Sequence, residues 1–266
     1  MLRSQIAIGV GIGIALTTAT AALAQLEHGC EHEDTLESHI GHVMWCWDDT
    51  PGHHGLLVTA LAEGETALEY AALAAAESAD LATIRTNLAQ VAHALDPRSE
   101  PEGEGLGYGL SLAAEGAAVH ISFALQAENS FGIEAAPDGD GYDYGNGDGD
   151  AIDSALDQAF DETAIHETSD FVRVQAELAT LSLANASAWS AEALALAQAA
   201  RGVDDPAAAR SEAGEVLAAL RAAMSGRDLD GDGVISAAAG EGGLSQAHEA
   251  MLAIIAEESL TNPYAG

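Results

Sequence analysis

Lysine is absent from this chain of 266 residues, in which only eight residues are arginine whereas 43 are aspartate or glutamate. The formal net charge is −35 at pH 7, and it becomes −36 (7 arginines against 43 acids) if Arg3 leaves with an N-terminal signal. Such a charge repels nucleic acids and anionic lipid surfaces, and it favours metal cations as partners. An alternative stays open for most carboxylates, because a solvated acidic surface also maintains solubility in concentrated salt.

Long apolar runs are missing as well, because no segment after the N-terminal region has about 18 consecutive apolar residues, as a membrane-spanning helix requires. The first 24 residues instead have the features of a secretory signal: a basic Arg3, an apolar run over 6–16 and the small-residue cleavage site Ala22-Leu23-Ala24. We expect a periplasmic or secreted protein that begins near Gln25 and does not insert into membranes. No cysteine follows the cleavage site directly, so lipid attachment is not expected.

The motifs that identify common enzyme classes are also absent. The chain has no Gly-x-Ser-x-Gly, no His-Glu-x-x-His and no glycine-rich phosphate loop with a lysine. Covalent haem attachment is excluded because there is no Cys-x-x-Cys-His. Carboxylates are so abundant that no pair of them indicates a catalytic site. The sequence therefore predicts a protein that is not an enzyme.

Apolar residues recur every three or four positions along most of the chain, which is the period of an α-helix. We expect N-caps at Asp80, at Thr50 before Pro51 and at Asp205 before Pro206. The expected helices cover 35–47, 50–78, 80–95, 107–128, 151–201 with a new start at Asp170, 206–224 and 242–260. The fold class is all-α: after a polar segment over 25–34, an up-and-down helical bundle occupies 35–201.

A segment rich in glycine and aspartate interrupts the bundle at 129–150. A loop of this length is either disordered or ordered by an ion. No alignment of the segment gives three alternate aspartates followed by a glycine and an apolar residue. Disorder and a weak cation site therefore both stay open for 129–150.

The stretch Asp228-Leu229-Asp230-Gly231-Asp232-Gly233-Val234-Ile235-Ser236 has aspartates at three alternate positions, and a glycine where a tight loop must turn. It resembles the first two-thirds of an EF-hand calcium loop. The helices expected on both sides extend the resemblance to a C-terminal helix-loop-helix unit over 206–260.

The resemblance implies particular calcium ligands. It assigns side-chain oxygens of Asp228, Asp230 and Asp232, the backbone carbonyl of Val234, and Ser236 acting directly or through water. The position of the usual bidentate glutamate is occupied by Ala239, and Glu241 follows two residues later. Either Gly240 lets a lengthened loop bring Glu241 to the ion, which we favour, or water fills the vacancy. We expect calcium affinity in the weak range of about 10⁻⁴–10⁻³ M and a structural or low-affinity sensing function.

Six of the ten histidines, both cysteines and one methionine lie between residues 28 and 54, and imidazole and sulfur suit zinc or copper. A transition-metal carrier or sensor is therefore the alternative function, with a tentative second site at His39, His42, His53 and His54. The cluster comprises His28, Cys30, His32, His39, His42, Met44, Cys46, His53 and His54.

The two cysteines also permit a disulfide, the usual state in an oxidising compartment. If a helix starts at Thr35, Cys30 just reaches Cys46, provided that the segment before the helix folds back along it.

A bundle could further gather His42, His120 and His166 around a metal or haem, because metal sites in bundles form between facing helices. Simple burial with a hydrogen bond is the competing interpretation of His120, and also of His248. No protein partner is predicted.

Overall fold

The computed structural model describes residues 35–127, 170–237 and 240–261, and within these ranges all regular structure is helical. The prediction of an all-α helical bundle is confirmed. The elements are α2 (Leu36–Met44), the 3₁₀ helix η2 (Pro51–His53), α3 (Leu56–Ala74), α4 (Leu81–Leu95), α5 (Leu110–Ala127), α7 (Asp170–Arg201), α8 (Pro206–Ser225) and α9 (Leu244–Thr261).

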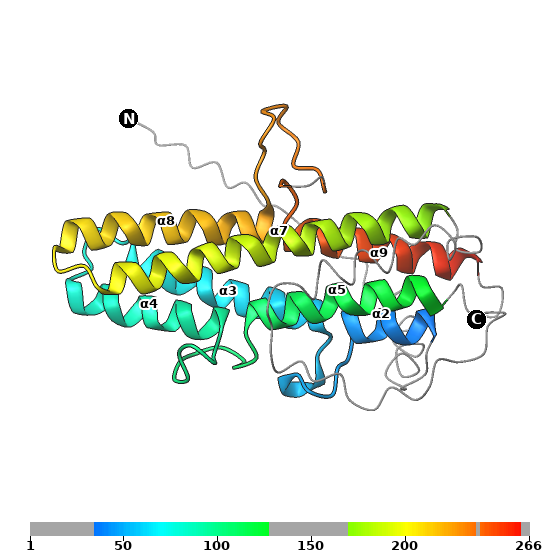
Figure 1. Cartoon of the computed structure of the whole chain (residues 1–266), viewed down its shortest axis with the longest axis horizontal. Helices are drawn as coiled ribbons and strands as arrows, with labels where there is room; N and C mark the ends of the chain where they lie inside the picture. The colour runs from blue at the N-terminus through cyan, green and yellow to red at the C-terminus, as the bar shows by residue number, and fades with distance from the viewer. Residues whose placement is uncertain (1–34, 128–169, 238–239, 262–266) are drawn as a thin grey trace, which may run out of the picture.

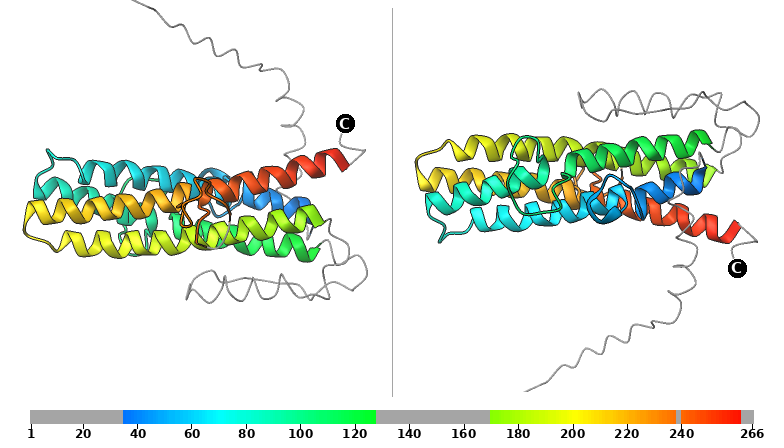
Figure 2. Two further views of the ribbon diagram at one scale, coloured as in Figure 1. Left: turned by 90° about the horizontal axis from the view of Figure 1, so that it is seen from above. Right: turned by 90° about the horizontal axis from the view of Figure 1, so that it is seen from below.

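The bundle is elongated, and α7 is the one helix among these that runs along its whole length (Figure 1). Shorter helices follow one another in pairs beside it: α2 and α3, α4 and α5, and α8 and α9. One half of the bundle packs α3, α4, α8 and the second half of α7 together. The other half packs α2, α5, α9 and the first half of α7, as the views in Figure 2 also show.

Capping residues explain why several helices begin where they do. Asp80 Oδ1 accepts a hydrogen bond of 2.8 Å from Thr83 N at the start of α4, and this bond lowers the pKa of Asp80. Asp205 Oδ1 accepts from Ala208 N at 2.8 Å, with Pro206 as the first residue of α8. Each cap satisfies a backbone N–H group that has no partner inside the helix. Both caps agree with the sequence prediction.

The segment between α2 and α3 differs from the prediction. Helix α2 ends at Met44 instead of Trp47, and α3 begins at Leu56 instead of Pro51. The hydroxyl of Thr50 lies 2.8 Å from the carbonyl oxygen of Trp47 and 2.5 Å from that of His54, so it does not cap a helix. A side chain on Gly55 would overlap the backbone of Met44. The chain therefore passes close to the end of α2 just before α3 starts.

The core is continuous along the bundle and is rich in alanine, which allows helices to approach closely. Leucine, isoleucine and valine fill the wider positions, such as Leu57, Ile84, Leu183 and Val216. Helices α8 and α9 contribute buried residues to this same core. The predicted unit over 206–260 therefore packs directly against the helices of the predicted bundle over 35–201.

A buried carboxylate organises the turn between α4 and α5. Glu63 on α3 is fully buried, and its Oε1 accepts hydrogen bonds from Tyr108 N at 2.9 Å and Gly109 N at 3.0 Å. Its Oε2 accepts from Leu106 N at 3.2 Å. These bonds satisfy backbone groups next to the N-terminus of α5, where a negative charge is also favoured by the helix dipole.

No helix within the described part of the chain is long and apolar enough to cross a membrane. The predicted signal over 1–24, the polar segment over 25–34 and the acidic loop over 129–150 lie outside the described residues. So does Cys30, and the predicted disulfide with Cys46 stays a prediction.

Candidate metal centres

The loop between α8 and α9 folds around its first aspartate. Asp228 Oδ1 accepts a hydrogen bond from Gly231 N at 2.7 Å, and Asp228 Oδ2 accepts from Gly233 N at 3.0 Å. Gly233 has a φ of 87°, which a residue with a side chain rarely adopts. The predicted need for glycine at the sharp turn is thus confirmed.

The next two aspartates accept hydrogen bonds from backbone N–H groups further along the same loop. Asp230 Oδ1 accepts from Asp232 N at 3.0 Å, and Asp232 Oδ1 accepts from Val234 N at 2.7 Å. An ionised carboxylate has about four lone-pair sites, so each of these side chains keeps further capacity to bind a cation.

Glu241 points back into this loop from two residues beyond the usual position. It is 6% exposed, and its Oε2 accepts hydrogen bonds from Ser236 Oγ at 2.5 Å and Ser236 N at 3.3 Å. Its Oε1 accepts from Leu229 N at 3.3 Å. The bond from the Ser236 side chain is the main cause of a lowered pKa at Glu241, which keeps the carboxylate ionised.

Three carboxylates converge as a result. One oxygen each of Asp228, Asp230 and Glu241 lie within 4.8 Å of one another, and this group does not include Asp232. Ser236 contacts Glu241 directly, whereas the side chain of Val234 is exposed.

Helix α7 anchors the end of the loop that carries Glu241. Asn185 Oδ1 accepts a hydrogen bond of 2.8 Å from Gly240 N, and Asn185 Nδ2 donates one of 3.1 Å to the carbonyl oxygen of Gly242. Arg227 N donates to the carbonyl oxygen of Glu241 at 2.8 Å, which closes the two ends of the loop. The backbone on both sides of Glu241 is therefore held in place by α7. Sequence reasoning did not identify Asn185.

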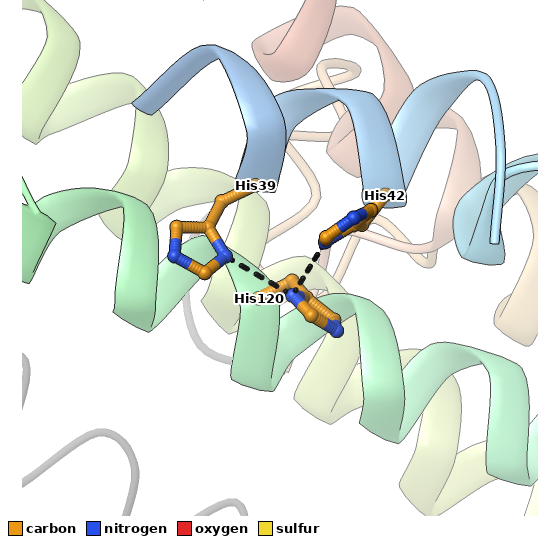
Figure 3. Close-up of side chains that lie close together, drawn as sticks. All are labelled: His39, His42 and His120. Atoms are coloured by element: carbon orange, nitrogen blue, oxygen red, sulfur yellow. Dashed lines mark hydrogen bonds between the residues drawn. The ribbon is translucent and has the colours of Figure 1, made fainter. Parts of the chain in front are cut away.

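A second cluster lies where α2 packs against α5 (Figure 3). His39 and His42 are three residues apart and share one face of α2. The Nδ1 atom of His120 on α5 lies 3.2 Å from His39 Nδ1 and 3.4 Å from His42 Nδ1. All three side chains are buried, with exposed fractions of 8%, 5% and 5% for His39, His42 and His120.

Aromatic rings surround the three histidines. The ring centroid of Trp47 is 4.6 Å from that of His120 and 4.9 Å from that of His42. The ring centroid of Phe123 is 5.7 Å from that of His39. Burial, followed by the proximity of His42 and His39, lowers the pKa of His120 to about 3. His120 is therefore a neutral imidazole at neutral pH.

The structure brings together two of the four histidines of the tentative second site. His39 and His42 are together, but His53 and His54 are exposed on the segment before α3 and do not join them. His120 lies beside His42, as expected for the alternative group of His42, His120 and His166. His166, the third residue of that hypothesis, lies outside the described residues, and His248 is half-buried rather than buried.

The two clusters define a protein with two candidate metal centres of different chemistry, one of carboxylates and one of imidazoles. No family model, curated protein or solved structure matches the chain. The function must therefore be argued from the geometry of the sites.

Proposed function

We propose that the protein binds calcium in the loop 228–241, with Asp228, Asp230 and Glu241 as its carboxylate ligands. The observation that carries this proposal is the convergence of the three carboxylates within 4.8 Å, although Glu241 lies 13 residues after Asp228. Three carboxylates so close together repel one another when no cation is present. A bound divalent cation removes this cost.

Calcium fits the donor set better than other common cations. The ligands are oxygens, and calcium accepts six to eight of them at variable angles, whereas magnesium requires a strict octahedron. Asp232, the carbonyl of Val234 and water can complete the coordination in the exposed part of the loop. The absence of nitrogen and sulfur donors from this group disfavours zinc and copper.

The role of Ser236 differs between the loop resemblance and our proposal. The resemblance implies that Ser236 binds the ion directly or through water. Its hydrogen bonds to Glu241 Oε2 instead suit a residue that orients the carboxylate toward the ion. Because part of the ligand set lies in an exposed loop, we expect binding in the range of about 10⁻⁴–10⁻³ M, which suits a structural or low-affinity sensing role outside the cytoplasm.

Calorimetric titration with calcium tests the proposal. The wild-type protein should bind one calcium ion at millimolar levels, and Glu241→Gln should weaken binding by on the order of tenfold or more, because a charge and a bidentate contact are lost. Glu249→Gln on α9 removes the same charge at an exposed position and is the matched control. We expect it to bind like the wild type, because exposed charges act only through screened attraction. An absence of calcium binding by the wild type at millimolar levels would reject the proposal.

A second substitution tests the length of the loop. Ala239 occupies the position where an EF-hand loop of ordinary length has its glutamate. If Glu241 is the ligand, Ala239→Glu should leave calcium affinity unchanged or reduce it. Tighter binding by Ala239→Glu would instead indicate a loop of ordinary length in which water fills the vacant position.

A further inference from the structure

We propose that His39, His42 and His120 form a second, independent metal site that binds one transition-metal ion, with zinc as the ion that fits best. This site goes beyond calcium binding and shares no residue with the loop 228–241. It is assembled from α2 and α5, whereas the calcium loop connects α8 and α9 and is anchored by α7.

The spacing of the nitrogen atoms is the first support. Two imidazole nitrogens that bind one zinc ion at about 2.0–2.1 Å in tetrahedral geometry are separated by about 3.3–3.4 Å. His120 Nδ1 lies 3.2 Å from His39 Nδ1 and 3.4 Å from His42 Nδ1. One ligand atom of each of the three histidines lies within 4.8 Å of the others, so an ion can enter with movements of the rings.

Hydrogen bonding alone does not explain this arrangement. The Nδ1 atom of a neutral imidazole carries either one proton or one lone pair, so it makes one good hydrogen bond at a time. His120 Nδ1 has two nitrogen neighbours at hydrogen-bonding distance, while His120 Nε2 is buried and has no hydrogen-bond partner in the described part of the chain. A cation at the centre would accept lone pairs from all three Nδ1 atoms and so offset the burial of three polar rings.

The donor atoms and the size of the adjoining cavity determine which metal or cofactor fits the site. The group contains only imidazole nitrogens, which suit zinc, copper and nickel and not calcium or magnesium. The cavity that adjoins His39 has a volume of about 10 Å³ and is lined mainly by apolar side chains. A single water molecule needs about this much space, so a haem could not enter without separating the helices. Three protein ligands leave the fourth position of a tetrahedral ion for water or another small ligand.

Metal titration of the purified protein, after removal of metals with a chelator, tests the site. Zinc, added in competition with a chromophoric chelator, should bind with one tight equivalent per chain. Copper(II) should quench part of the tryptophan fluorescence, because the Trp47 ring lies 4.6 Å from the His120 ring. His120→Gln should weaken zinc binding by about a hundredfold or more, because only two of the three ligands remain.

Two control variants separate this site from the other histidines. The double variant His53→Gln/His54→Gln removes the two exposed histidines, and His28→Gln/His32→Gln removes two that lie outside the described residues. Both should keep the tight zinc equivalent. Loss of that equivalent in either control, with its retention in His120→Gln, would assign the metal to the N-terminal histidines and overturn our proposal.

A measurement on the unaltered protein keeps the test valid if His120→Gln does not fold. X-ray absorption at the zinc edge of the protein with one zinc equivalent should show three imidazole nitrogens at about 2.0 Å. Failure to bind zinc at micromolar concentration would show that the histidines form a hydrogen-bonded cluster without metal. Repeating the titration with Glu241→Gln should give the same zinc affinity, so failure at one site is distinguishable from failure at the other.

Discussion

His120 Nδ1 lies 3.2 Å from His39 Nδ1, although the two residues are 81 positions apart in the chain. The contact joins α5 to α2, the shortest α-helix of the described part, whose N-terminus follows residues that lie outside it. A metal ion at this point would bond directly to side chains of both helices and so link α2 to α5.

Zinc should therefore stabilise the folded protein against heat. A ligand at a concentration of about 100 times its dissociation constant adds about 2.7 kcal/mol to the free energy of unfolding. For a chain of this size that gain raises the melting temperature by roughly 5–10 °C. Calorimetric melting of the metal-free protein with and without zinc measures the shift. His120→Gln should show little of it, and an equal shift in that variant would place the stabilising ion elsewhere.

The burial of neutral His120 should make stability depend on pH. A histidine in the unfolded chain has a pKa of about 6.5, whereas the pKa of His120 in the folded protein is about 3. Between these pH values the unfolded state binds more protons than the folded state. The contribution of neutral His120 to the free energy of unfolding is therefore fully present above pH 6.5, and it is lost as the pH falls toward 3. The loss is at most about 1.4 kcal/mol per pH unit.

Urea unfolding in the presence of a chelator measures this effect. The wild type should lose stability relative to His120→Gln as the pH falls from 7 to 4. The comparison with the variant is needed because protonation of the many surface carboxylates changes the stability of both proteins alike. A difference between the two proteins that does not change with pH would contradict the assignment.

Glu63 should be important for stability although it belongs to neither metal centre. Removing its carboxylate with Glu63→Ala leaves three backbone N–H groups without their acceptor, and we expect a loss of at least about 3 kcal/mol. Glu63→Gln keeps one oxygen and should lose about 1–2 kcal/mol. Glu65→Gln, on the exposed face of the same helix, should change the free energy of unfolding by less than about 0.5 kcal/mol. Equal effects of Glu63→Gln and Glu65→Gln in urea unfolding would refute this role.

Asn185 should affect calcium binding without touching the ion. Asn185→Ala removes both side-chain hydrogen bonds that fix Gly240 and Gly242. The entropy lost when the loop becomes ordered then opposes calcium binding. We expect calcium affinity to fall by about three- to tenfold, and hydrogen exchange to rise over 226–243. Gln198→Ala, at an exposed position of the same helix, serves as the control. Unchanged affinity in Asn185→Ala would show that α7 does not organise the loop.

Local chemistry made much of the fold predictable from the sequence. The caps at Asp80 and Asp205 depend on residues only three positions away, and the structure has both. Thr50 does precede a helix with Pro51 as its first residue, the short η2, but the Thr50 hydroxyl lies against the carbonyl oxygens of Trp47 and His54 and makes no cap hydrogen bond. The close approach at Gly55, which delays the start of α3, depends on packing that no local pattern reveals.

The two candidate sites also differ in how far the sequence alone predicts them. Asp228, Asp230 and Glu241 lie within one loop, so the spacing of the aspartates and Gly240 indicated that they group together, although the sequence also added Asp232, which the group does not include. His120 belongs with His39 and His42 only because α5 packs against α2 in one register. The sequence grouped His120 with His42 as one possible bundle site, but it did not add His39 to that group and left simple burial of His120 open.

A crystal structure of the protein grown in millimolar calcium tests the proposed function most directly. We expect a single ion in the loop 228–241, with oxygens of Asp228, Asp230 and Glu241 about 2.3–2.6 Å from it. Anomalous scattering would distinguish calcium from water. An empty loop at millimolar calcium, or an ion that is bound without Glu241, would contradict the proposed site.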